Sequence, residues 1–159
     1  MVNILVIGSG AREHAIIKSL NKSKKEKEIY CLASNNNPGI SDICKEMKII
    51  DINDAQLIKD YSIKQSINIA IIGPENPLAH GVADSLWEAE IGVVGPKKNL
   101  AQIETSKSFT RNLLREYKIP GCPKFKTFTN IIGVEDFLSI LGENDVVKYD
   151  GLAGGKGVK

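Results

Sequence analysis

Short apolar runs alternate with amphipathic stretches through the first two thirds of the chain. The runs are rich in Ile, Val and Leu and end at turn-forming residues, as strands buried on both faces of a parallel sheet do. Strands are expected on this basis over residues 2–7, 28–33, 47–50, 68–72 and 91–94. Apolar positions at helical spacing predict helices over residues 11–20, 40–45, 54–65 and 82–89. Strands that alternate with helices predict an α/β fold, an open parallel sheet with helices on both faces.

The pattern changes after residue 96. Residues 99–117 predict one long amphipathic helix, and the Ile-Pro-Gly-Cys-Pro segment at 119–123 predicts a break. Beyond it we expect a strand over 124–128, a helix over 131–141 and a strand over 145–149, followed by a glycine-rich loop. These elements are too few to close a core. We therefore expect a domain over 1–100, a connecting helix and linker over 101–122, and a truncated second domain over 123–159.

Composition and charge exclude several classes of protein. The chain of 159 residues is 42% hydrophobic and 25% charged, which is ordinary for a globular protein. Its 21 basic and 19 acidic residues give a net charge of +2, which is too balanced to favour a nucleic-acid or membrane surface. The three cysteines have no metal-site spacing, and no apolar run approaches the roughly 20 residues that span a bilayer. We expect a soluble cytoplasmic protein with reduced thiols.

The first candidate site is the Gly8-Ser9-Gly10 loop between the first strand and the first helix. Free backbone N–H groups and the positive end of the helix dipole suit a phosphate there. A dinucleotide fingerprint would place a third glycine where Glu13 stands and an acidic residue about 20 positions on, where none is found. NAD binding is therefore disfavoured. Arg12, Glu13 and His14 are candidate ligand contacts; alternatively, Glu13 only complements the dipole and His14 only packs.

The second candidate is the Gly-Pro-Glu-Asn-Pro-Leu loop at 73–78, which also follows a strand. Ligands of open α/β sheets bind beyond the carboxyl ends of the strands, where the strand order reverses. The loops after the first, second and fourth strands are therefore expected to share one site. Glu75 would offer a carboxylate to hydroxyls or to an amine; the alternative is a rigid turn with an exposed acid.

The third candidate is the segment 147–158. Lys148 on an expected strand, followed by a glycine loop that contains Lys156, suits a nucleoside triphosphate. The segment is not a Walker sequence. A merely flexible turn is the alternative.

Together these segments resemble the phosphoribosylamine–glycine ligase family of ATP-grasp enzymes. Residues 8–15 resemble its G-x-G-G-R-E-H-A signature, 73–78 its G-P-E-x-P-L loop, 95–107 its G-P…A-x-L-E-x-S-K segment and 147–158 its V-K-A-D-G-L-A-A-G-K-G-V loop. Ala11, Tyr149 and Gly154 depart from the family pattern, as does the 35–39 segment, which keeps only Asn37 and Gly39. None of these departures removes a charged group.

The resemblance implies a Rossmann-like (pre-ATP-grasp) sheet followed by the incomplete start of an ATP-grasp lid. It implies a ligase of purine biosynthesis that joins glycine to 5-phosphoribosylamine through a glycyl phosphate, using ATP and Mg²⁺ or Mn²⁺. The implied phosphoribosylamine site comprises Gly8, Gly10, Arg12, Glu13, His14, Asn37, Gly39, Glu75, Pro77 and Leu78. The implied ATP site comprises Lys107, Lys148, Gly151, Leu152, Gly154, Gly155, Lys156 and Gly157.

The resemblance also sets expectations about what this chain lacks and what it binds. Metal ligands and the glycine site are expected beyond Lys159, and no residue of this chain is assigned as catalytic. The chain alone is therefore expected to be an inactive fragment. Its partners are expected to be small molecules, with no nucleic acid and no membrane, and the full enzyme is expected to be a monomer. Two alternatives remain open: another ATP-grasp ligase acting on a phosphorylated substrate, and a stand-alone nucleotide- or phosphate-binding module.

Overall fold

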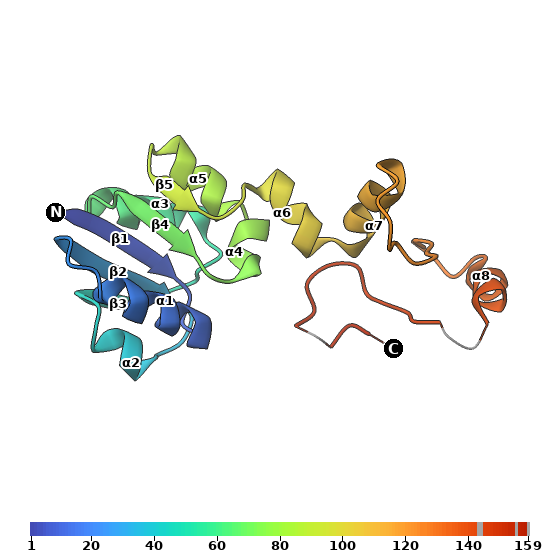
Figure 1. Cartoon of the computed structure of the whole chain (residues 1–159), viewed down its shortest axis with the longest axis horizontal. Coiled ribbons are helices and arrows are strands. Elements are labelled where there is room, and N and C mark those ends of the chain that lie inside the picture. Colours follow the sequence, from blue (N-terminus) through green and yellow to red (C-terminus); the bar gives the residue numbers. More distant parts are fainter. Residues whose placement is uncertain (143–144, 155, 159) are drawn as a thin grey trace. The chain divides into compact units, whose positions relative to one another are not determined.

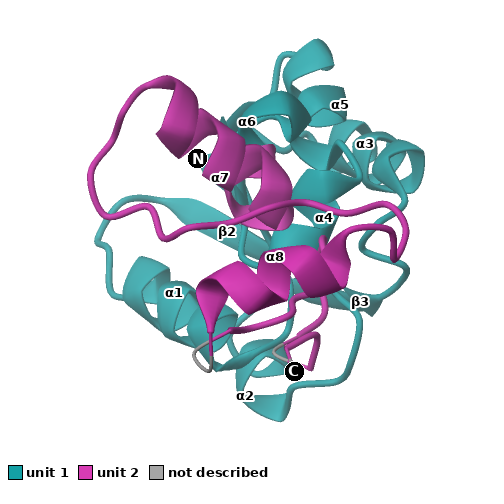
Figure 2. Ribbon diagram, turned by 90° about the vertical axis from the view of Figure 1, so that its right-hand side faces the viewer, with its two compact units in different colours: residues 1–101 teal, residues 102–159 magenta. Residues whose placement is uncertain are grey.

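The computed structural model describes residues 1–142, 145–154 and 156–158. They belong to two compact units, Met1–Ala101 and Gln102–Lys159, coloured teal and magenta in Figure 2. No helix among the described residues is long and apolar enough to cross a membrane.

The first unit is built on a five-stranded parallel sheet (Figure 1). Its strands are β1 (Val2–Ile7), β2 (Lys27–Ala33), β3 (Glu46–Ile49), β4 (Ile69–Ile72) and β5 (Gly92–Val94). The strand order is β3-β2-β1-β4-β5, and every neighbouring pair is parallel. The chain therefore builds outward from β1 to β3 and then returns to the other side of β1. The order reverses between β1 and β4, and the expected open parallel sheet is confirmed.

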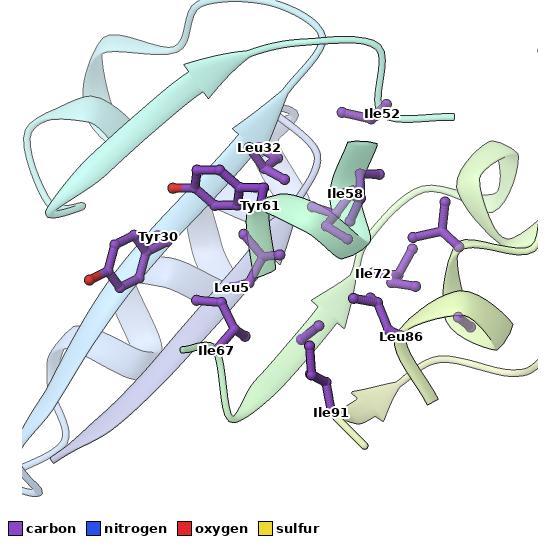
Figure 3. Close-up of a cluster of buried hydrophobic side chains, with 14 residues drawn as sticks. Leu5, Tyr30, Leu32, Ile52, Ile58, Tyr61, Ile67, Ile72, Leu86 and Ile91 are labelled. Carbon is purple, nitrogen blue, oxygen red and sulfur yellow. The ribbon is translucent and has the colours of Figure 1, made fainter. Parts of the chain in front are cut away.

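Helices cover both faces of the sheet, as expected. They are α1 (Ala11–Asn21), α2 (Pro38–Ser41), α3 (Ala55–Lys64), α4 (Glu75–Ala79) and α5 (Val82–Glu88). Because side chains alternate along a strand, Leu5 and Ile7 of β1 enter one buried cluster and Val6 enters another. The first cluster includes Ile58 of α3 and Leu86 of α5 (Figure 3). The second takes its helical residues from α1 and α2, such as Ile17 and Ile40.

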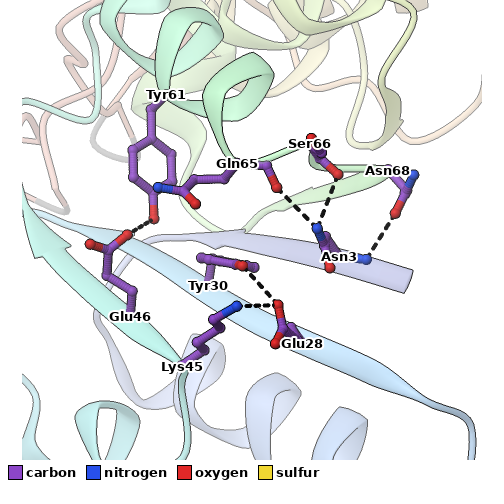
Figure 4. Close-up of polar contacts among 9 residues, drawn as sticks. All are labelled: Asn3, Glu28, Tyr30, Lys45, Glu46, Tyr61, Gln65, Ser66 and Asn68. Carbon is purple, nitrogen blue, oxygen red and sulfur yellow. Dashed lines mark hydrogen bonds and ion pairs between the residues drawn. The ribbon is translucent and has the colours of Figure 1, made fainter. Parts of the chain in front are cut away.

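Polar contacts hold the strands together at the end of the sheet opposite the carboxyl ends of β1 and β4 (Figure 4). The Asn3 side chain donates to the carbonyl oxygens of Gln65 and Ser66 at 3.0 and 3.2 Å, and the Asn3 amide donates to Asn68 Oδ1 at 2.8 Å. These bonds hold the start of β1 to the turn between α3 and β4. The loops that follow β1 and β4 lie at the opposite edge.

One segment expected as a loop contains a helix. α4 begins at Glu75, directly after Pro74, whose backbone is extended. Proline favours helix starts because its missing N–H would have no partner there. The Gly73–Leu78 motif is therefore a short turn that runs into α4.

The second unit departs more from expectation. The expected single helix over 99–117 is wrong, because α6 (Lys98–Thr105) and α7 (Lys107–Glu116) are separated at Ser106. Ser106 is extended, with φ −129° and ψ 116°, and its hydroxyl accepts from the Phe109 amide at 3.1 Å. A serine that caps a new helix favours a break over continuation.

The two strands expected in the second unit are also wrong. Among the described residues of 124–128 and 145–149, the structure has only one antiparallel bridge, between Lys148 and Val158. Strands need neighbours to satisfy their backbone groups, and these segments have no further strand to pair with. α8 (Val134–Leu141) forms after Gly133, slightly later than expected.

Candidate functional site

The loop between β1 and α1 turns at two glycines. Gly8 is buried and has φ +121°, a conformation that favours glycine, and its amide donates to the Leu32 carbonyl at 2.8 Å. Gly10 is the N-cap residue of α1. Its amide donates to Glu13 Oε2 at 2.7 Å, so one of the N–H groups expected to face a ligand is already satisfied by the protein.

Glu13 joins this loop to the one after β4. It is only 4% exposed. A methyl group added at Gly73 would lie 2.1 Å from Glu13 Oε1, and one added at Gly8 would lie 2.8 Å from Glu13 Cγ. Glu13 leaves no room for a side chain at Gly73, and Glu13 and Pro74 together leave none at Gly8. Glu13 lies in the first turn of α1, where a carboxylate complements the dipole.

Arg12 is the charged group of this loop that faces solvent. Its Nε lies 3.1 Å from Glu13 Oε1, while its side chain remains 63% exposed. The buried carboxylate therefore anchors one side of the guanidinium, and the exposed remainder is available to an anion.

The loop after β2 is fastened to the loop after β1. Asn37 Nδ2 donates to the Ser9 carbonyl at 2.9 Å, and Asn37 Oδ1 accepts from the Ile40 amide at 3.3 Å as the N-cap of α2. A methyl group added at Gly39 would lie 2.5 Å from His14 Cε1, so the imidazole packs against that glycine. Asn37, Gly39 and His14 are therefore brought together, with the Asn37 amide engaged at both ends.

The loop after β4 contributes Glu75, Pro77 and Leu78. The Gly73 amide donates to the Ile7 carbonyl at 3.0 Å, which places this loop beside the end of β1. Glu75 is half-buried, and its carboxylate makes no hydrogen bond or ion pair with any residue that the structure describes. Pro77 is fully buried, and Leu78 is half-buried in α4. Glu75 thus remains available to a ligand, whereas Pro77 supports the helix.

The expected meeting of the loops after β1, β2 and β4 is thus found. It brings together Gly8, Gly10, Arg12, Glu13, His14, Asn37, Gly39 and Gly73 through direct contacts. Sequence reasoning missed Gly73 as a partner of Glu13, because the two are far apart in the chain. Only the approach of β4 to β1 makes them neighbours.

In the second unit, Asp150 organises the start of α7. Its carboxylate accepts from the amides of Lys107 and Ser108 at 2.8 and 3.2 Å, and from the hydroxyls of Ser106 and Ser108. Partial burial opposes ionisation, but these hydrogen bonds outweigh it and lower the pKa of Asp150 below its usual value. Lys107 Nζ donates to the Gly151 carbonyl at 2.7 Å. The residues that follow Lys148 are thus fastened to the first turn of α7.

The glycine-rich segment forms a closed loop. The Lys148–Val158 bridge and a 2.9 Å bond from the Tyr149 amide to the Gly157 carbonyl join its two ends. The Lys156 amide donates to the Ala153 carbonyl at 2.9 Å within it. Leu152 is half-buried, Gly154 and Lys156 are exposed, and Gly155 lies outside the described residues.

Two of the expected ATP-binding lysines line one pocket of about 230 Å³. Its lining residues are Ile103, Glu104, Lys107, Thr110, Arg111 and Lys148. Arg111 was not anticipated from the sequence. Its spacing from Lys107 could have indicated it, because residues four apart share one helix face.

The described residues do not offer a metal site. No three His, Cys, Asp or Glu side chains among them come together in a way that could hold an ion. The cations in the pocket of the second unit would instead favour an anion.

Comparison with known proteins places both units in one family. Residues 2–104 match the family described as phosphoribosylglycinamide synthetase, N domain, and residues 105–159 match its ATP-grasp (A) domain. The phosphoribosylamine–glycine ligase of Methanosarcina barkeri is 45% identical over 158 residues, which make up 99% of this chain. The chain spans only 36% of the length of that relative.

Solved structures support the fold. The N5-carboxyaminoimidazole ribonucleotide synthetase of Thermotoga maritima matches with a TM-score of 0.71 and 18% identity, over 100% of this chain and 40% of the other. The phosphoribosylglycinamide synthetase of Anaerococcus prevotii matches with a TM-score of 0.56 and 13% identity, over 74% of this chain and 29% of the other. At such low identity the likeness concerns the fold alone.

Proposed function

The chain belongs to the phosphoribosylglycinamide synthetase family, and from this we propose that it supplies the amino-terminal part of a phosphoribosylamine–glycine ligase. The complete enzyme would convert ATP, glycine and 5-phosphoribosylamine into glycinamide ribonucleotide, ADP and phosphate. The terminal phosphoryl group of ATP would pass to the glycine carboxylate, and the amine would then attack the glycyl carbonyl and expel phosphate. We propose that this chain binds substrates without completing the reaction by itself, and that the complete enzyme works in the cytoplasm as a monomer.

The observation that carries the proposal is the meeting of three loops at the carboxyl edge of the sheet, where the strand order reverses between β1 and β4. Open α/β sheets bind ligands at this position. The exposed face of Arg12, beside the start of α1, suits the phosphate of 5-phosphoribosylamine. The Glu75 carboxylate suits its hydroxyls or amine, because a carboxylate accepts hydrogen bonds from such donors.

Glu13 and Asn37 have a different role in this proposal. Their polar atoms bond to the protein: Glu13 to Gly10 and Arg12, and Asn37 to Ser9 and Ile40. We therefore assign them as positioning residues. They fix the positions of the loops after β1, β2 and β4 relative to one another, while Arg12 and Glu75 contact the substrate.

The second unit would bind the nucleotide. Lys107 and Lys148 line one pocket, and the loop at 151–157 begins beside it. Fixed cations at the phosphates stabilise the negative charge of phosphoryl transfer, which depends mostly on positioning. Mg²⁺ or Mn²⁺ is proposed for the complete enzyme, but the described residues do not form a site that fits it, and no step here depends on it. In this scheme residues 1–100 bind the substrate, 101–122 connect, and 123–159 begin the lid.

The test measures the melting temperature of the first unit with and without ribose 5-phosphate. Unfolding is monitored by the fluorescence of Trp87, the sole tryptophan, which lies in α5. A ligand at a hundred times its Kd adds about 2.7 kcal/mol to the free energy of unfolding. We expect a rise in melting temperature that Arg12→Ala greatly reduces. Lys18→Ala is the matched control, because Lys18 is an exposed cation at the other end of α1.

Two results would contradict the substrate assignment. One is stabilisation by NAD but not by ribose 5-phosphate, which would restore the dinucleotide interpretation. The other is a response to ribose 5-phosphate that Arg12→Ala and Lys18→Ala leave equally intact.

A further inference from the structure

The pocket of the second unit contains more positive charge than two ATP-binding lysines account for. Lys107, Arg111 and Lys148 line it, and Glu104 is the only acidic residue among its lining residues. Lys107 Nζ bonds to a neutral carbonyl, that of Gly151. The side chains of Arg111 and Lys148 make no hydrogen bond or ion pair with any residue in the part of the chain that the structure describes. The pocket therefore carries excess positive charge.

Three structural features bring these cations together. Lys107 and Arg111 lie four residues apart on α7 and so share one face of that helix. Lys148 stands two residues before Asp150, which is bonded to the amides of Lys107 and Ser108. The corner between α6 and α7 is closed by a hydrogen bond from the Thr110 hydroxyl to the Ile103 carbonyl, and both residues line the pocket. Hydrogen bonds and a shared helix face thus hold the three cations in one place.

The size and charge of the pocket indicate which part of a ligand it can bind. Its volume of about 230 Å³ is below the roughly 300–1,000 Å³ typical of sites that enclose a whole small molecule. A pocket of this size suits the charged end of a nucleotide better than the entire molecule. An arginine presents a planar fork of donors that matches phosphate oxygens in pairs, which a lysine cannot do.

We propose that Arg111 is a third polyphosphate-binding residue, which contacts the phosphate chain of the nucleotide together with Lys107 and Lys148. The identity of the nucleotide as ATP rests on the proposed function, whereas the affinity of the pocket for a polyphosphate chain does not. Inorganic tripolyphosphate and ATP are therefore separate probes of the two claims.

The experiment titrates the 159-residue chain with tripolyphosphate and, separately, with ATP, and follows arginine Nε–Hε signals by NMR. The sequence has only three arginines, Arg12, Arg111 and Arg115. Arg115→Gln is the matched control, because Arg115 lies one turn further along α7, is exposed and bonds to Asn112. We expect the Arg111 signal to shift on addition of tripolyphosphate and the Arg115 signal to stay in place.

Loss of a charge-assisted hydrogen bond predicts that Arg111→Gln weakens tripolyphosphate binding by about ten- to a hundredfold. Arg115→Gln should change it by less than about twofold. Arg111→Lys keeps the positive charge but loses the paired donors of the guanidinium, so it should give an intermediate affinity. It replaces Arg111→Gln as the test variant if the glutamine variant does not fold.

Each outcome bears on a different claim. Equal affinities for the Arg111→Gln and Arg115→Gln variants would overturn the role of Arg111, while a loss in Lys148→Ala would still support the proposed nucleotide site. Binding of tripolyphosphate that depends on Arg111, without any binding of ATP, would uphold this inference and contradict the proposed function. No shift of the Arg111 signal with either probe would overturn the inference.

Discussion

Replacing Gly73 by alanine tests whether Glu13 joins the loops after β1 and β4. The three atoms nearest to the added methyl group all belong to Glu13, with Oε1 at 2.1 Å and Cδ and Cγ at 2.5 Å. The backbone of Gly73 does not have a positive φ, so alanine is not strained for conformational reasons. The methyl group can be accommodated only if the buried carboxylate moves. Its bond to the Gly10 amide would then be lost or distorted.

The expected cost follows from these contacts. A buried hydrogen-bonding group left unsatisfied costs about 1–3 kcal/mol, and a side chain forced off its rotamer costs about 0.5–1.5 kcal/mol. Replacement of glycine by alanine recovers about 0.4–1 kcal/mol by restricting the unfolded chain. We therefore expect Gly73→Ala to lower the free energy of unfolding of the first unit by about 1–3 kcal/mol.

A double-mutant cycle isolates the contact from other effects. In a Glu13→Ala background the obstructing carboxylate is absent, so Gly73→Ala should be neutral or stabilise by about 0.4–1 kcal/mol. The coupling energy should then be about 1.5–4 kcal/mol, well above the roughly 0.3–0.5 kcal/mol seen for independent sites. Urea unfolding monitored by Trp87 fluorescence and by circular dichroism would measure all four proteins.

Gly92→Ala is the matched control. Gly92 also lies in the first unit, and a methyl group there would meet only ordinary contacts, with the nearest atom, the Asn68 carbonyl oxygen, at 3.5 Å. Its effect should be the same in both backgrounds. If Gly73→Ala and Glu13→Ala were additive within about 0.5 kcal/mol, the proposed positioning role of Glu13 would be wrong.

Three further predictions address other parts of the chain. Asn37→Ala removes both the bond to Ser9 and the cap of α2, so it should cost about 1–2 kcal/mol in urea unfolding, with Asn37→Asp, which keeps the cap, costing less. The pKa of Asp150 is lowered in the folded chain, so the stabilising contribution of its carboxylate should be complete above the usual pKa of 3.8 and be lost as the pH falls through the lowered pKa. The NMR shifts of the Lys107 and Ser108 amides should follow that titration. They should not follow it in the Asp150→Asn variant. Burial raises the pKa of the Cys31 thiol to about 12 and that of the Cys44 thiol to about 11. Iodoacetamide at neutral pH should therefore leave both thiols unmodified until urea unfolds the chain, because the thiolate is the reactive form. Peptide mass mapping would measure the modification.

The sequence predicted the first unit well because its signals are local. Four-residue apolar runs and helical spacing are properties of neighbouring residues, and the observed strands, α1, α3 and α5 follow them with small shifts at their ends. The helix expected over 40–45 lies earlier, at Pro38–Ser41, and α4 was not expected. Asp54, which stands directly before the helical spacing of α3, caps that helix by accepting from the Leu57 amide at 2.9 Å. The meeting of the loops after the first, second and fourth strands was also expected, from the general rule for ligand sites in open α/β sheets.

The failures occurred where a distant residue decides the structure. The break between α6 and α7 is stabilised by the cap from Ser106 and also by Asp150, whose carboxylate bonds to the first two amides of α7 from more than 40 residues away. The expected strands of the second unit lacked partners within the described residues. Arg111 was missed because a basic residue on a polar helix face is ordinary until Lys148 is brought beside it.

The replacement of the third glycine of the dinucleotide fingerprint by Glu13 now has a structural interpretation. In a dinucleotide site that glycine lets the helix approach the strand, and the amides of the turn remain free for a pyrophosphate. Here a buried carboxylate occupies the turn and accepts the Gly10 amide. A second anion at the same amide would be repelled, because two like charges at short range interact strongly in a partly buried site. In the function that we propose, a phosphate bound by this loop would therefore lie toward the exposed guanidinium of Arg12, a position that suits the single phosphate of a sugar better than the linked phosphates of a dinucleotide.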